Sequence, residues 1–296
     1  MIDPELSVVL ADPGRKCSID GAVAALERGS DGVSTELIVV RAGSKDRAAK
    51  TQFRDSDIRF EFRADGTLTP QLWGTGLSVA RGRFVAFTTG QMRVGPNWAQ
   101  TLLSTIREGA VGVAGPIELA LGADTATAAA YFLRFSAFTP EAWPASAPAR
   151  DIPGDNAAYR RDAVMRHADL LPEGFWEVEF HRRFEREGLT LRMEPAASAT
   201  LIGPVSFGAM FHQRFQHGVE FGFSRVHRHH ESRLKLLLAA PLVPLVLLAR
   251  IGKRAWAARR NRGRFVAVLP RLAVLATSWA CGEAIGALHV RSRGLP

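Results

Sequence analysis

The chain has 296 residues, of which 47% are hydrophobic and 23% are charged. These proportions exclude a disordered protein and leave room for one large α/β domain or for a domain with an appendage. The net charge of +9 is confined to residues 250–296, where ten Lys or Arg face one acidic residue, Glu283. The neutral remainder lacks a basic helix, which argues against nucleic acid and favours anionic membrane lipids as partners of the tail.

The two cysteines of the chain, Cys17 and Cys281, lie far apart in the sequence and lack CxxC spacing. We therefore expect reduced thiols that pack in the interior of a cytosolic protein, and neither a disulfide nor a metal site. The first residues lead straight into an apolar segment without the basic and apolar regions of a secretory signal peptide.

The first predicted elements form a βαβ unit. Residues 6–10 are apolar and rich in β-branched side chains, and the turn-forming residues 11–14 follow them. A helix is predicted over residues 20–28 and a second strand over residues 36–40. The two strands should be parallel, and ligands of such sheets bind beyond the carboxyl ends of the strands, which here means residues 11–14 and 41–44.

Helices and strands continue to alternate as far as residue 193, which predicts an α/β fold with a mostly parallel central sheet and flanking helices. Residues 45–65 form a charged stretch without a clear period, and residues 120–150 carry little signal. The further predicted elements are helices over residues 72–79 and 97–106 and strands over residues 83–87, 111–116 and 190–193.

Residues 153–161 and 174–183 together predict a substrate-facing loop, a helix start and then a second helix that carries two glutamates. Glu177 and Glu179 are two residues apart, so on a helix they point to different sides and only one can face a given cleft. One is a candidate base, and the other is an expected partner of a nearby arginine. Taken alone, such a pair is typical of a solvated helix face.

The order of these features resembles the family-2 glycosyltransferases of the GT-A fold over roughly residues 5–200. The resemblance rests on the strand, helix, strand order, on an interrupted strand near residue 88, and on the Gly154-x-Asn156 and Glu177-x-Glu179 elements. It implies a Rossmann-like GT-A domain followed by a hydrophobic helical tail. It also implies transfer of a sugar, with inversion, from an activated donor to a lipid-linked or cell-envelope glycan acceptor.

The donor side departs from the family pattern. Where the family has Val-Val-Asp-Asp-Gly-Ser after the second strand, this chain has Val-Val-Arg-Ala-Gly-Ser, with Arg41 in place of an acid. The family's metal-binding Asp-x-Asp corresponds to Thr89 and Gln91, whose neutral oxygens do not supply the anionic ligands that Mg²⁺ or Mn²⁺ prefers. The resemblance therefore implies no divalent-metal cofactor. The implied donor-binding residues are Ala11, Asp12, Arg41, Thr89 and Gln91.

The acceptor side is closer to the family. Residues 153–161 resemble its Gly-x-Asn-x-x-x-Arg-Arg segment, and residues 176–183 resemble its Glu-Asp-x-[Asp/Glu]-[Leu/Phe]-x-x-Arg element, with Trp176 replacing the first acid. The resemblance implies that Glu177 is the general base that accepts the proton of the acceptor hydroxyl. Trp176 would stack on a sugar face, although core packing explains it equally well. The implied acceptor-binding residues are Asp155, Asn156 and Trp176.

Arginines are the expected substitute for a metal at the donor's phosphates, because a guanidinium offers a fixed fork of donors to phosphate oxygens. Besides Arg41, the candidates are Arg81, Arg214 and Arg225. For each of them, a solvated charge or a carboxylate partner is the alternative.

The C-terminal tail has two apolar segments separated by a basic one. Residues 234–249 fall short of the ~20 residues needed to span a bilayer, and residues 250–264 are predicted to form a polybasic loop. Residues 265–290 are long enough to span but are interrupted by Pro270-Arg271 and by Glu283. A membrane hairpin, helices lying in the interface and a buried soluble pair of helices are the alternatives.

Three segments are therefore expected: a GT-A domain over residues 1–205, a helical connector over residues 206–233 and a membrane-associating tail over residues 234–296. Positive charge between the apolar segments predicts the cytoplasmic face of the cell membrane. Two classes of function stay open. One is an enzyme that uses a nucleotide-sugar or polyprenyl-phosphate-sugar donor. The other is a non-catalytic GT-A module (a pseudo-glycosyltransferase) that binds a glycan, a lipid or a partner transferase, since both acidic donor motifs are lost.

Overall fold

The structure is a computed structural model of the chain and describes residues 3–14, 18–43, 53 and 58–289. It divides into two compact units, one formed by Met1–Leu121 with Phe138–Ile202 and the other by Gly122–Ala137 with Gly203–Pro296. Residues 122–137 thus belong with the C-terminal helices, whereas the sequence placed them inside a continuous N-terminal domain. Cys17 and most of the predicted charged stretch, residues 45–52 and 54–57, lie outside the described residues. Cys281, which was expected to pack in the interior, is instead exposed.

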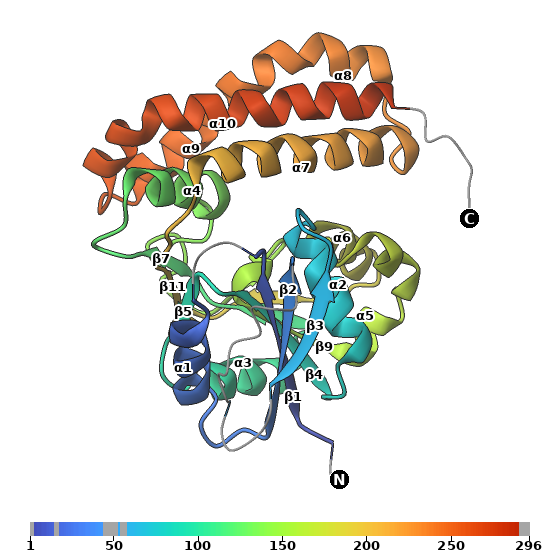
Figure 1. Cartoon of the computed structure of the whole chain (residues 1–296), viewed down its shortest axis with the longest axis vertical. Helices are drawn as coiled ribbons and strands as arrows, with labels where there is room; N and C mark the ends of the chain where they lie inside the picture. The colour runs from blue at the N-terminus through green and yellow to red at the C-terminus, as the bar shows by residue number, and fades with distance from the viewer. Residues whose placement is uncertain (1–2, 15–17, 44–52, 54–57, 290–296) are drawn as a thin grey trace. The chain divides into compact units, whose positions relative to one another are not determined.

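The first unit is built on an eight-stranded sheet with the order β3-β2-β1-β4-β9-β6-β10-β8, of which Figure 1 labels β1, β2, β3, β4 and β9. The neighbours β3, β2, β1 and β4 are all parallel, which confirms the parallel pairing expected for the first two strands. β9 runs antiparallel between β4 and β6, β10 is parallel to β6, and β8 is an antiparallel edge. The strands are β1 (Leu6–Asp12), β2 (Thr35–Ala42), β3 (Arg59–Arg63), β4 (Phe84–Thr89), β6 (Gly112–Ala114), β8 (Ala147–Ala149), β9 (Ala157–Arg160) and β10 (Leu191–Met193).

Helices cover both faces of this sheet, as the continuous apolar character of its central strands requires. On one face, Val8 and Leu10 of β1 pack in the same core as α1 (Asp20–Gly29) and α3 (Trp98–Arg107). On the other face, Val9 of β1 packs in a second core with α2 (Thr69–Val79), α5 (Arg161–Met165) and α6 (Glu177–Arg186). The fold is therefore α/β with a large, mostly parallel central sheet, as the sequence predicts at this level.

A second, three-stranded sheet completes the first unit. β11 (Ala199–Leu201) lies between β5 (Met92–Val94), to which it is antiparallel, and β7 (Ile117–Leu119), to which it is parallel. These strands have three residues each, too few to show a period, and the sequence did not predict them. Residues 157–160 also differ from the prediction, since they are a strand where a loop leading into a helix was expected.

The second unit consists of helices in the residues that the structure describes. They are α4 (Thr125–Phe135), α7 (Phe207–His227), α8 (Arg233–Ala239), α9 (Val243–Ala257) and α10 (Arg262–Leu288), with a short 3-10 turn between α8 and α9. α7 and α10 pack side by side and run in the same direction, since Gly218 lies against Trp279 and Gly222 lies against Glu283 (Figure 1).

The predicted boundaries of the tail need correction. Arg233–Ala257 is a helical segment of 25 residues and α10 has 27 residues, and the most apolar 18-residue windows of the two have mean hydropathies of 2.1 and 1.5, so both are long and apolar enough to cross a membrane. The expected polybasic loop is mostly helical, because Lys and Arg are good helix formers and α9 continues through them to Ala257. Neither Pro270 nor Glu283 interrupts α10.

Candidate active site

Most of the predicted site residues lie in the first unit, at the edge where β1, β2 and β4 end. The register pairs Asp12 with Arg41 and Ala11 with Thr89, so the ends of three parallel strands are level with one another. β9 is antiparallel to β4, and the turn that precedes it, Gly154–Asn156, therefore lies beside the carboxyl end of β4. Parallel sheets bind their ligands at this edge.

A buried ion pair occupies the ends of β1 and β2. Asp12 Oδ2 accepts a hydrogen bond of 2.6 Å from Arg41 Nε, and Asp12 Oδ1 accepts one of 3.1 Å from the backbone N–H of Gly14. The side chains are 7% and 10% exposed, respectively. The arginine that replaces the expected acid is thus neutralised by the aspartate of the neighbouring strand. Ala11 is fully buried in the core, and its contact with a donor stays a prediction.

The end of β4 carries two hydroxyls, Thr88 and Thr89, whose side chains are 1% and 4% exposed. Neither Oγ1 atom has a hydrogen-bond partner among the described residues. Successive strand residues point to opposite faces, so these hydroxyls face the two different helical layers. Gln91 follows in the turn to β5, where its backbone oxygen accepts a hydrogen bond from Ile202.

Asn156 has a structural role. It is fully buried, its Oδ1 accepts a hydrogen bond of 2.7 Å from Trp98 Nε1, and its Nδ2 donates to the carbonyl oxygens of Pro116 and Ala197. The amide thus ties three separate segments together and has no surface left for a ligand. The described structure thus gives Asn156 a packing role, and its contact with an acceptor stays a prediction. Asp155 beside it is also buried, at 3% exposed.

Glu177 is the first residue of α6 and lies next to the Gly154–Asn156 turn. A Cβ atom on Gly154 would meet the Glu177 carboxyl carbon at 3.3 Å and the Trp73 ring at 2.9 Å, so a glycine is needed for this close approach. Trp73 in turn donates a hydrogen bond of 2.9 Å from Nε1 to the backbone oxygen of Thr88. An unbroken series of contacts therefore joins the end of β4 to the Glu177 carboxyl group.

The start of α6 is fixed by its attachment to α2. Phe175 N–H donates a hydrogen bond of 2.7 Å to the backbone oxygen of Pro70, and Gly174, with φ of +109°, lies so close to Gln71 that a Cβ atom would be 2.8 Å from its backbone. Trp176 Nε1 donates to the backbone oxygen of Glu173 at 2.9 Å, and its side chain is partly exposed.

Glu179 points away from Glu177 and forms an ion pair of 3.3 Å with Arg182. Its side chain is 15% exposed. The prediction that one glutamate of the pair is a structural partner of a nearby arginine is confirmed.

Three residues that the sequence analysis did not single out form a hydrogen-bonded series beside Glu177. Tyr159 Oη lies 2.9 Å from His181 Nε2, and His181 Nδ1 lies 3.2 Å from Asp151 Oδ1. Tyr159 and His181 are 0% and 1% exposed, while the Asp151 side chain is 48% exposed. The series runs from the core to the surface, and Glu177 shares a face of α6 with His181, four residues further along.

Electrostatics assign the protons in this series. Burial raises the pKa of Tyr159 well above its usual value, and the charges of Glu177 and Asp151 add to the rise, so the phenol is protonated and donates to His181 Nε2. Burial lowers the pKa of His181 despite the opposing effect of Asp151. The hydrogen bond from His181 lowers the pKa of Asp151. The imidazole is therefore neutral, with its proton on Nδ1 facing a carboxylate.

Arg81 lies at the opposite end of the strands, just before β4 begins, and its guanidinium donates to Glu36 at 2.9 Å and 3.0 Å. Because Arg81 precedes the strand whose carboxyl end is the candidate site, it does not meet Asp12 and Thr89. A carboxylate partner, the alternative considered for this arginine, is therefore present, and its contact with a phosphate stays a prediction.

Arg214 and Arg225 belong to the second unit, on α7. Arg225 Nη1 donates to Glu283 at 2.5 Å, and its Nε and Nη2 donate to Glu231 at 2.9 Å and 2.6 Å. Arg214 Nη2 lies 3.2 Å from His217 Nδ1. Carboxylate partners, the alternative considered for these arginines, are thus present for Arg225.

Among residues 3–14, 18–43, 53 and 58–289, no group of three or more His, Cys, Asp or Glu side chains is placed to hold a metal ion. That the protein works without a divalent metal stays a prediction. Comparison with protein-family models found no family that matches the chain, and comparison with curated proteins found no match. The local geometry therefore carries the functional argument alone.

Proposed function

We propose that the chain is a membrane-associated glycosyltransferase of the GT-A type, which transfers a sugar with inversion to a lipid-linked or cell-envelope glycan acceptor. The observation that carries the proposal is the position of the Glu177 carboxyl group, which closely approaches Gly154 at the carboxyl edge of the central sheet, where Trp73 also contacts this glycine. The sheet order with one antiparallel strand inside it, and the small second sheet, support a GT-A domain.

In the proposed reaction, Glu177 accepts the proton of an acceptor hydroxyl as the oxygen attacks the anomeric carbon of the donor sugar. The bond from the anomeric carbon to the phosphate oxygen breaks, and the phosphate leaves with the electron pair. The donor is a nucleotide sugar or a polyprenyl-phosphate sugar. Tyr159 and His181 stay neutral, so the negative charges near the base are those of the carboxylates.

Replacement of Glu177 by Gln tests the proposal. We expect E177Q to reduce transfer by about 10²-fold to 10⁴-fold, because a general base contributes that much to the rate. Incubation of the full-length protein in membranes with radiolabelled sugar donors, followed by extraction of lipid-linked and glycan products, measures the transfer. E179Q is the matched control on the same helix, since Glu179 contacts Arg182 and should leave turnover within a few-fold. Equal turnover in E177Q and the wild type would rule out Glu177 as the base.

A non-catalytic GT-A module is the second candidate, and a specific feature favours it. Asp12 is engaged by Arg41, and Thr89 stands where the family has a carboxylate, so two acidic contacts to a donor are missing together. Isothermal titration with a panel of nucleotide sugars and polyprenyl-phosphate sugars distinguishes the two. Saturable binding of a donor supports the enzyme, and the absence of binding across the panel, with retained binding of a glycan or lipid, supports the module.

A further inference from the structure

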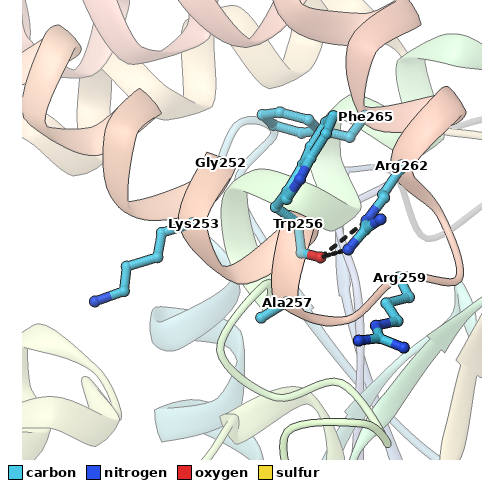
Figure 2. A pocket seen from close by; sticks show the side chains of 7 residues that line it. All are labelled: Gly252, Lys253, Trp256, Ala257, Arg259, Arg262 and Phe265. Atoms are coloured by element: carbon cyan, nitrogen blue, oxygen red, sulfur yellow. Dashed lines mark hydrogen bonds between the residues drawn. The ribbon is translucent and has the colours of Figure 1, made fainter.

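An open hollow of about 630 Å³ lies at the turn between α9 and α10 (Figure 2). Its lining includes three cationic side chains, Lys253, Arg259 and Arg262, together with the rings of Trp256 and Phe265. No lining residue is acidic. A cationic hollow with aromatic walls is suited to an anion that has an apolar portion.

The sequence around the hollow is rich in basic residues and poor in acidic ones. Residues 250–264 contain seven Lys or Arg, and residues 232–282 contain no Asp or Glu. The side chains of Lys253 and Arg259 are exposed and make no hydrogen bond or ion pair with the described part of the chain. A surface with this imbalance attracts anions and gains most from a partner that brings several negative charges together.

Arg262 is held in place before any ligand binds. Its Nε and Nη2 donate to the backbone oxygen of Trp256 at 2.9 Å and 2.7 Å, and its guanidinium carbon lies 5.0 Å from the centre of the Trp256 ring (Figure 2). Its Nη1 has no partner within the described ranges. α10 begins at the same place, and its N-cap, Asn261, makes no side-chain capping hydrogen bond. The positive end of the helix dipole therefore adds to the fixed arginine.

The hollow lies at the polar ends of two apolar helical segments. Arg233–Ala257 exposes Leu238, Leu242 and Leu245, and α10 exposes Val266 and Val274. Only 11% of the most apolar window of Arg233–Ala257 is buried, which differs from a core helix of a soluble protein. Trp256 is 54% exposed at the boundary between the apolar and the basic surface, where tryptophan is enriched in proteins that contact a bilayer.

We propose that this hollow binds the headgroup of an anionic phospholipid at the membrane surface. Arg262 and Arg259 contact the phosphate oxygens, Lys253 supplies further positive charge, and the exposed apolar faces of α9 and α10 contact the acyl chains. Charge complementarity and the adjoining lipid-compatible surface select this occupant. The proposal does not depend on Glu177 or on any transfer reaction, so the two can fail separately.

The test uses the full-length protein in micelles of a neutral detergent, into which phosphatidylglycerol or phosphatidylcholine is titrated, with native mass spectrometry to count retained lipids. The wild type should retain phosphatidylglycerol in preference to phosphatidylcholine. The K253Q/R259Q variant should lose that preference by about tenfold or more, because each basic residue near an anionic surface contributes about fivefold. These two side chains make no contact that folding requires, and circular dichroism checks the fold.

The matched control is R250Q/R254Q, which removes the same charge from exposed positions of α9 outside the hollow. It should retain most of the preference. Equal losses in the two double variants would overturn the proposal in favour of diffuse charge, and equal retention of the two lipids by the wild type would overturn it outright. Complete displacement of phosphatidylglycerol by millimolar inorganic phosphate would also overturn it, since the hollow would then be a site for a free anion.

Discussion

His181 is an ionisable residue that the fold keeps uncharged in the core beside Glu177. Its neighbours are Tyr159, which donates to it, and Asp151, which accepts from it. Burial in the folded state lowers the pKa of His181 below its ordinary value of 6.5. As the pH falls below 6.5, the unfolded chain therefore binds a proton more readily than the folded one. This contribution to stability is therefore complete above pH 6.5 and decreases as the pH falls toward the folded pKa.

The expected outcome is a free energy of unfolding that falls between pH 7 and pH 5, with a shallower fall in His181→Asn. His217 on α7 also has a lowered pKa and adds to the slope in both proteins, so the difference between the two slopes isolates His181. Urea denaturation of the full-length protein in detergent, followed by tryptophan fluorescence at each pH, measures it. Parallel slopes would contradict the assignment of a neutral His181.

Residue-level prediction succeeded where spacing alone determines a relationship. The two-residue separation of Glu177 and Glu179 was enough to assign them to different sides of a helix, and the ion pair of Glu179 follows from it. The role implied for Asn156 rests on a motif, and a motif does not report burial, so the complete enclosure of this amide could not be predicted from the sequence. The series of Tyr159, His181 and Asp151 was missed because its members come from different elements. Only the four-residue spacing of Glu177 and His181 on α6 could have indicated it.

At the level of elements, the contact between α7 and α10 depends on glycines on both helices. A Cβ atom at Gly222 would lie 2.1 Å from the backbone oxygen of Glu283, and one at Gly282 would lie 2.1 Å from that of Phe215. Small residues that face each other on two helices, and that recur every four residues along each helix, let the two backbones approach closely. Any side chain added at these positions must move a whole helix.

Gly282→Ala should therefore destabilise the protein by about 1–3 kcal/mol, the usual cost of overpacking a tight contact. Gly263→Ala is the control on the same helix, because nothing lies within 4 Å of its Cβ position, and alanine there should stabilise by up to about 1 kcal/mol. Thermal unfolding followed by circular dichroism in detergent compares them. Equal melting temperatures for the two variants would show that α7 and α10 can move apart to admit a methyl group without a loss of stability.

The long strands were predictable, whereas of the three-residue strands only β6 and β10 were predicted. β1 and β2 have seven and eight residues, and their apolar runs are long enough to predict buried strands without an alternating pattern. β5, β7 and β11 have three residues each and are specified by pairing with distant segments. α4 was missed since an alanine-rich segment has no marked polar face. The tail was predicted as apolar and basic, but its first apolar segment was predicted over residues 234–249 only. The helical segment is Arg233–Ala257, because lysine and arginine are good helix formers.

For the whole molecule, the distribution of charge and apolar surface along the chain predicts contact with lipid. Its charge and its least buried apolar surface both lie in the C-terminal unit, in residues 233–288. A soluble pair of helices would bury that apolar surface, whereas the window within Arg233–Ala257 is 11% buried and that within α10 is 44% buried. Lipid contact is therefore expected for the first segment in particular, whether it spans the bilayer or lies in the interface.

Membrane fractionation of cells that express the full-length protein tests this expectation. We expect the protein to stay in the membrane pellet through a wash with 1 M salt, in which the Debye length falls to about 3 Å and surface charge is screened. It should also stay there in alkaline carbonate, since the apolar faces remain. The K253Q/R259Q variant should behave likewise, because it leaves those faces intact. Release by salt alone would mean that basic residues hold the protein at the surface without insertion, and recovery in the soluble fraction would mean that protein covers the two segments.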